Sequence, residues 1–131
     1  MIKIDIQDNK YSINKQEIVD SIKQTIIKNN GPQDASLSVT IENEKTVFEL
    51  AKKYLHENDD EAKGHPVLSF LVSEIEGRFI LPPDEENYLG EIIVSFEQAQ
   101  KNALQAGHSL GTEIVNLVNH ATLHLLGIHH N

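Results

Sequence analysis

The C-terminal part of the chain reads Asn119-His120-Ala121-Thr122-Leu123-His124-Leu125-Leu126-Gly127-Ile128-His129-His130. His120 and His124 are four residues apart, so on a helix their side chains lie one turn above the other and can bind the same ion. Gly127 follows where a helix commonly ends in a left-handed residue. A turn there brings a third histidine, His129 or His130, back toward the first two. Three histidine ligands with a fourth position open to water are the arrangement of a catalytic zinc site.

The spacing of this stretch favours His130 as the third ligand. Positions 120, 124, 127 and 130 match the H-x-x-x-H-x-x-G-x-x-H skeleton of the metzincin proteases. Zinc proteases place a glutamate directly after the first histidine as general base, whereas this chain has Ala121 there. A metallopeptidase would therefore keep its metal and lose its base, which makes this the weaker hypothesis.

Length and composition predict one domain over residues 1–131, with 39% hydrophobic residues. The chain has no cysteine, which excludes disulfides and thiolate metal sites and fits a reducing compartment. No apolar run approaches the roughly 20 residues of a membrane span, and the N-terminus lacks the pattern of a signal peptide. We therefore expect a cytoplasmic protein that does not bind a membrane.

The formal net charge of −9 argues against broad electrostatic attraction to nucleic acid. An RNA substrate would then depend on a local basic patch, on the metal or on a partner to offset the negative field. Segments 57–61 and 84–86 are acidic, but neither has the alternating ligands and glycine of a calcium loop. Both are interpreted as solvated loops.

Two periodicities divide the chain into strands and helices. The first pattern is an alternation of apolar and polar residues, as at Ile2, Ile4 and Ile6, which is typical of a half-buried strand. The second is the recurrence of apolar residues at helical spacing from Ile18 onward, after a plausible cap at Asn14. The predicted strands are 1–7, 36–42, 67–72 and 89–95, and the predicted helices are about 15–28, 43–57, 96–106 and 112–126. The apolar strand 67–72 is expected to be buried on both faces, and 57–63 and 77–87 are expected to be loops.

This order of elements, βαβαββαα, predicts an α+β fold with a small mixed four-stranded sheet and helices packed on it. In the last helix one face is apolar, formed by Ile114, Leu117, Val118, Ala121 and Leu125. At about 100° per residue, the two helical histidines lie at the edge of that face, where a cleft can form. Glu113, two turns earlier, is either a surface acid near the helix N-terminus or a partner of a ligand histidine.

Residues 120–130 resemble the H-G-x-L-H-L-x-G-Y-D-H motif of the YbeY-type endoribonucleases, the rRNA maturation factors. Val67-Leu68-Ser69-Phe70 is similar to the V-L-S-F strand of that family, and residues 89–95 are similar to its L-G-D-I-x-I-S segment. Residues 107–109 and 113 also fall where the family has similar residues. The resemblance covers about residues 40–130.

The resemblance implies an α+β fold related to zinc proteases, with a zincin-like metal helix at the C-terminus. It implies one Zn²⁺ per chain, bound by His120, His124 and His130. The implied activity is metal-dependent cleavage of single-stranded RNA, in maturation of the 3′ end of small-subunit rRNA and in ribosome quality control. The implied partners are rRNA precursors and ribosomal particles, and DNA is not expected.

The chain departs from the family at positions that bear on catalysis. Ala121, Ile128 and His129 replace the glycine, tyrosine and aspartate of the motif, and Leu55 stands where the family has an arginine after a tyrosine. A zinc-bearing, ribosome-associated binding module without catalysis is therefore the alternative function.

The general base of the reaction has two candidates. Glu91 is placed on a strand expected to run near the cleft, and His129 carries an imidazole, a group suited to proton transfer near neutral pH. Ser69 either contacts a substrate phosphate or is satisfied within the protein.

Overall fold

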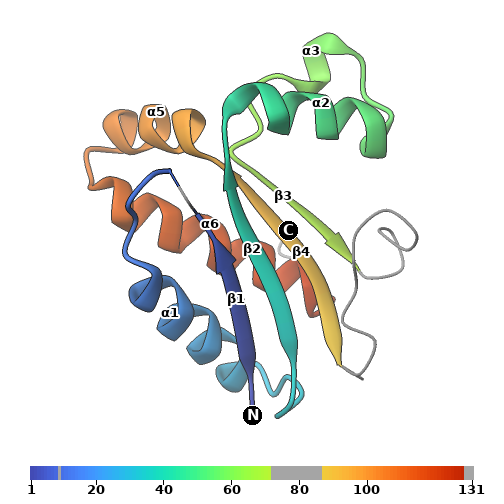
Figure 1. The fold of residues 1–131 in the computed structure, drawn as a ribbon, viewed down its shortest axis with the longest axis vertical. Helices are drawn as coiled ribbons and strands as arrows, with labels where there is room; N and C mark the ends of the chain where they lie inside the picture. The colour runs from blue at the N-terminus through green and yellow to red at the C-terminus, as the bar shows by residue number, and fades with distance from the viewer. Residues whose placement is uncertain (9, 72–86, 129–131) are drawn as a thin grey trace.

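The computed structural model describes residues 1–8, 10–71 and 87–128 (Figure 1). The elements are β1 Lys3–Gln7, α1 Lys15–Lys28, β2 Ser36–Glu42, α2 Glu44–Leu55, α3 Asp59–Ala62, β3 Val67–Leu71, β4 Tyr88–Ser95, α5 Phe96–Ala106 and α6 Leu110–Leu125. The strands form one sheet in the order β1-β2-β4-β3, in which β1, β2 and β4 are parallel and β3 is antiparallel to β4. The predicted α+β fold with a mixed four-stranded sheet is confirmed.

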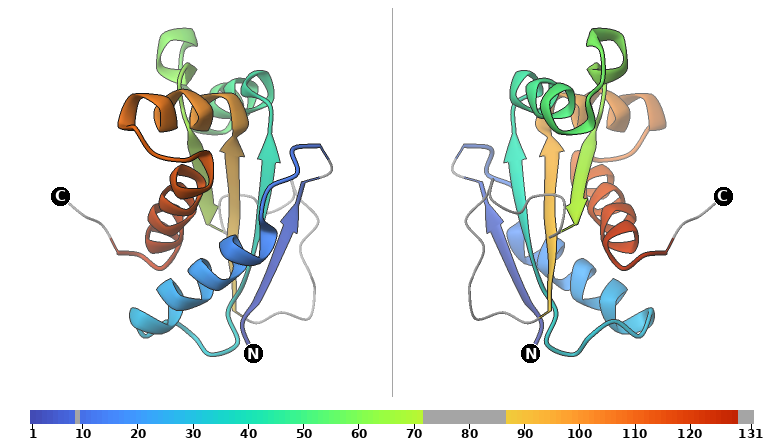
Figure 2. Two further views of the ribbon diagram at one scale, coloured as in Figure 1. Left: turned by 90° about the vertical axis from the view of Figure 1, so that its left-hand side faces the viewer. Right: turned by 90° about the vertical axis from the view of Figure 1, so that its right-hand side faces the viewer.

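Helices cover the two faces of the sheet unequally (Figure 2). On one face α1 and α6 enclose the larger apolar core, and on the other α2 and α3 cover a smaller cluster that includes Phe70 and Ile93. The larger core includes Ile18, Ile22, Ile26, Leu37, Val39, Ile92, Val94, Ile114, Val118 and Leu125. Burial of these side chains is the main driving force that holds α6 against the sheet.

Side-chain caps start the longer helices where the sequence offers Asn or Ser. Asn14, Asn43, Ser95 and Ser109 each accept a hydrogen bond from the backbone N–H three residues later, which satisfies one of the otherwise unpaired donors of the first turn. The predicted cap at Asn14 is confirmed. Within the described residues, no helix is long and apolar enough to cross a membrane.

Two expectations for local structure were wrong. The acidic segment 57–63 contains the short helix α3, which starts in a capping box between Asn58 and Glu61. One turn is too short to show helical periodicity, so only the cap could have revealed it. Strand β3 is not buried on both faces, because it lies at the edge of the sheet: Leu68 and Phe70 are buried, whereas Leu71 is exposed. The expected loop 77–87 lies almost entirely outside the described residues.

A register shift in β4 determines which of its side chains face which helix. Ser36 pairs with Tyr88, but Ser38 pairs with Glu91, so β4 carries one extra residue between these pairs. Gly90 lies in this irregular stretch at a φ of +147°, and a Cβ there would be 2.0 Å from the carbonyl oxygen of Phe70. Only glycine allows β3 to approach β4 this closely.

Candidate functional site

The two histidines of α6 lie on the exposed flank of the helix, beside its buried face. His120 and His124 are both exposed, whereas Ile114, Val118 and Ala121 are buried against the sheet. Four residues of helix separate the two imidazoles, so they project from the same side, one turn apart. The amphipathic arrangement of α6 expected from the sequence is confirmed.

A hydroxyl from the neighbouring strand contacts one of these histidines. The Oγ atom of Ser69 on β3 lies 2.7 Å from Nδ1 of His124. Ser69 pairs with Ile92 across the sheet and alternates with Leu68 and Phe70, whose side chains pack on the opposite face. Alternation along β3 separates Ser69 from its neighbours in the sequence, but only the packing of α6 beside β3 brings it to the histidine.

The end of α6 has the turn that the sequence predicted. Gly127 has a φ of +81°, its N–H donates to the carbonyl oxygen of His124, and the N–H of Ile128 donates to that of Leu123. These two bonds form a Schellman motif, which ends a helix at a left-handed residue. The chain therefore leaves α6 in a turn immediately before the remaining two histidines.

The proposed third ligand lies beyond the part of the chain that the structure describes. His129 and His130 follow the described residues directly, so neither the ligand role of His130 nor the base role of His129 is tested. Within residues 1–8, 10–71 and 87–128, no three His, Asp or Glu side chains lie together as a metal site. The ligand set His120, His124 and His130 therefore stays a prediction.

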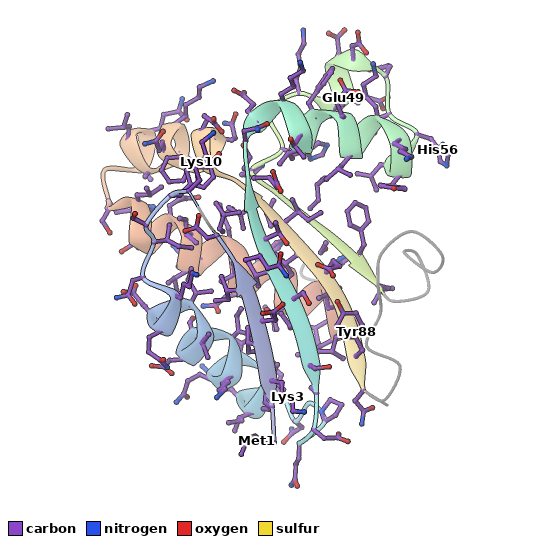
Figure 3. All side chains as sticks on the ribbon, viewed as in Figure 1. Met1, Lys3, Lys10, Glu49, His56 and Tyr88 are labelled. Atoms are coloured by element: carbon purple, nitrogen blue, oxygen red, sulfur yellow. The ribbon has the colours of Figure 1, made fainter. Side chains whose placement is uncertain are left out.

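Glu91 is not brought together with the histidines of α6. Its carboxylate accepts a hydrogen bond of 2.8 Å from the hydroxyl of Tyr88. The oxygen of that hydroxyl also lies 3.1 Å from Oγ of Ser38. Tyr88, labelled in Figure 3, belongs to the apolar cluster on the α2 and α3 side of the sheet. Burial raises the pKa of Glu91, although the Tyr88 hydrogen bond acts in the opposite direction. The sheet separates this carboxylate from α6.

Glu113 has a histidine partner, but not one of the predicted ligands. Its Oε1 atom lies 2.6 Å from Nε2 of His108, in the connection between α5 and α6, and its side chain is only 12% exposed. The pair links the start of α6 to the preceding turn. Glu113 is therefore neither the surface acid nor the partner of a ligand histidine that the sequence suggested.

One polar contact that sequence reasoning missed joins α6 to α1. Oδ1 of Asn119 accepts hydrogen bonds from Ser21 at 2.8 Å and from Thr25 at 3.1 Å, both on α1. Asn119 directly precedes His120, so this contact directs one side of α6 toward α1 and the histidine side away from it. The four-residue spacing of Ser21 and Thr25 marks one face of α1, but nothing in the sequence pairs that face with Asn119.

These features define a small α+β protein whose C-terminal helix presents two exposed histidines beside an edge strand. In a comparison with known protein families, the family model Endoribonuclease YbeY matches residues 3–131. The chain belongs to the Endoribonuclease YbeY family, which confirms the resemblance seen in the sequence.

Individual relatives agree with this assignment. Endoribonuclease YbeY of Caldicellulosiruptor bescii is 34% identical over 132 residues, covering 98% of this chain and 78% of that protein. Endoribonuclease YbeY of Dehalococcoides mccartyi strain BAV1 is 33% identical, covering 93% of this chain and 78% of that protein. The solution structure of TM1509 from Thermotoga maritima has the same fold, with a TM-score of 0.60 at 24% identity, covering all of this chain and 75% of that one.

Proposed function

We propose that residues 1–131 form one domain that acts as a metal-dependent endoribonuclease on single-stranded RNA during rRNA maturation. Membership of the Endoribonuclease YbeY family supports the nuclease activity. The observation that carries the metal dependence is the pair of exposed imidazoles at His120 and His124, one turn apart on α6.

The donor set suits a zinc ion. Imidazole nitrogens are neutral ligands that zinc accepts readily, and His130 follows the turn at Gly127 as the proposed third donor. When bound, Zn²⁺ supplies a Lewis acid that polarises a phosphoryl oxygen and lowers the pKa of water toward about 7. We propose one zinc ion per chain in this zincin-like arrangement at the end of α6.

The residues of the chain itself hold and orient the reactants. The buried face of α6 keeps the helix fixed on the sheet, so the backbone positions that carry the two imidazoles stay one turn apart beside β3. Because Glu91 lies on the opposite face, we propose His129 as the residue that accepts a proton, since imidazole titrates near neutral pH. Three neutral ligands leave a local charge of +2, which attracts phosphate despite the net charge of −9.

The proposed partners are an rRNA precursor, cleaved at the 3′ end of the small-subunit rRNA, and ribosomal particles, with a further role in ribosome quality control. The proposed location is the cytoplasm, because a chain without cysteine fits a reducing compartment.

The test is zinc content by elemental analysis and RNA cleavage, measured on the same samples of the wild-type protein and a His124→Ala variant. We expect about one zinc ion per chain, lost in the variant together with cleavage. His56→Asn is the control: it removes an exposed imidazole at the left-handed end of α2, where asparagine is also tolerated. Wild-type protein without zinc above background would contradict the proposal.

A binding module without catalysis is the second candidate. Leu55, at the position of the family arginine, is 39% exposed at the end of α2 and offers no positive charge to a phosphate. This candidate predicts that the wild-type protein binds zinc and ribosomal particles and cleaves none of the RNAs offered.

A further inference from the structure

The contact between β3 and α6 joins two residues that are 55 positions apart in the sequence. We propose that Ser69 is a positioning residue for metal binding: its hydroxyl accepts a hydrogen bond from Nδ1–H of His124 and directs Nε2 toward the metal. This inference rests on the proposed function, since it takes His124 as a ligand. The sequence had left two roles open for Ser69: a contact to a substrate phosphate, or a hydroxyl whose hydrogen bond is satisfied within the protein.

The backbone around Ser69 holds its hydroxyl in place. Its neighbours Leu68 and Phe70 are buried at 4% and 1% exposure on the opposite face of the sheet, so β3 cannot rotate about its own axis without exposing them. The ring of Phe70 also packs edge-on against Tyr54 of α2, with ring centres 5.8 Å apart. Ser69 is therefore presented to α6 by a strand that is fixed from its other side.

The helix is held equally closely on its side of the contact. Leu125, next to His124, lies over Gly90, where a Cβ would be 3.2 Å from the Leu125 side chain. The hydrogen bonds from α1 to Asn119 restrain α6 five residues earlier. Both partners of the 2.7 Å contact thus belong to packed elements, and the contact itself lies at the exposed surface between them.

The chemistry of imidazole gives this contact a consequence for the metal. In a neutral histidine one ring nitrogen carries the proton and the other carries the lone pair that binds a metal. A serine hydroxyl can accept from Nδ1–H, and this leaves the lone pair on Nε2. Histidines that bind metals commonly donate their other N–H to such a partner, and loss of the partner weakens metal binding about 10- to 100-fold.

The experiment compares zinc affinity among matched variants by competition with a chromogenic chelator. Ser69→Ala removes the hydroxyl and Ser69→Thr keeps it. Ser38→Ala removes a hydroxyl of the same size from β2, on the face of the sheet that carries Glu91. We expect zinc to bind Ser69→Ala about 10- to 100-fold more weakly than wild type, and the other two variants to bind it as wild type does. Thermal unfolding of each zinc-free variant checks that it folds.

A second readout needs no metal. Long-range ¹H–¹⁵N spectra of the zinc-free protein, at a pH where His124 is neutral, distinguish the protonated ring nitrogen from the unprotonated one. We expect Nδ1 of His124 to be protonated in the wild-type protein, and the proton to move largely to Nε2 in Ser69→Ala. A wild-type protein with the proton on Nε2 would overturn the proposed hydrogen bond.

The variants separate failure of this inference from failure of the proposed function. If Ser69→Ala binds zinc as tightly as wild type while His124→Ala loses it, the positioning role is overturned and the metal site stands. If Ser69→Ala changes only the KM for RNA at saturating zinc, Ser69 contacts substrate and the inference is again overturned. If neither wild type nor His124→Ala binds zinc, the proposed function itself fails.

Discussion

Among the glycines that the structure describes, Gly90 has the least room for a side chain. A methyl group there would meet the backbone carbonyl of Phe70 at 2.0 Å, at a φ of +147° that L-residues rarely adopt. We expect Gly90→Ala to lower the free energy of unfolding by about 3 kcal/mol or more, because β3 must move away from β4. Urea denaturation monitored by circular dichroism measures the change.

Gly64→Ala is the matched control for the Gly90 variant. Gly64 also has a positive φ, of +80°, but a Cβ there meets nothing within 4 Å. Gly64→Ala should lower the free energy of unfolding only by the backbone strain, about 1 kcal/mol. Equal losses in the two variants would show that the close approach of β3 contributes nothing.

Glu91 should make stability depend on pH in the direction opposite to most carboxylates. Burial raises its pKa in the folded state above the unfolded value, so the ionised carboxylate destabilises the fold at neutral pH, and stability is regained as pH falls through the folded pKa. Glu91→Gln keeps an oxygen that can accept from Tyr88 and removes the charge. We expect the variant to have a higher melting temperature than wild type near neutral pH, and the difference to vanish below about pH 4.

The same variant tests the role of Glu91 in the reaction. Because the carboxylate faces away from α6, we expect Glu91→Gln to cleave RNA at the wild-type rate. Loss of cleavage in a folded variant that still binds zinc would restore Glu91 as the general base.

At the scale of elements, α6 has three differently occupied sides. One side is buried in the apolar core, and a second carries Asn119, which accepts hydrogen bonds from α1. The third side carries the histidines and lies next to β3. We expect Asn119→Ala to lower the free energy of unfolding by about 1–2 kcal/mol, because the hydroxyl of Ser21 loses its acceptor and that of Thr25 keeps only the carbonyl oxygen of Ser21. Denaturant titration measures this loss. Asn116→Ala, at an exposed position of the same helix, should change stability little, and similar losses in both variants would contradict the role of Asn119.

At the scale of the whole molecule, zinc should stabilise the fold through the helix that carries its ligands. A ligand that binds only the folded state stabilises it by about 2.7 kcal/mol at 100 times its dissociation constant. We therefore expect zinc to raise the melting temperature of the wild-type protein, and a chelator to reverse the rise. Calorimetry of His124→Ala under the same conditions should show no rise, and an equal rise in that variant would assign the effect to zinc bound elsewhere.

The sequence by itself determined the features that depend on neighbours along the chain. These are the bounds of most elements, the cap at Asn14, the left-handed turn at Gly127 and the four-residue spacing of His120 and His124. Each follows from periodicity or from the conformational preference of one residue, and both are local properties. The sequence motifs also predicted the family of the chain, and the comparison with known proteins confirmed it.

Only the tertiary structure decided which side chains meet. The sequence placed Glu91 and Ser69 on two strands and offered each a role at the site. The pairing of β3 with β4 and the register shift between β2 and β4 turn Glu91 to one face of the sheet and Ser69 to the other. Ser69 then reaches His124 because burial of apolar residues docks α6 beside the edge strand. Contacts of this kind arise from strand order and helix packing, which no local pattern of residues encodes.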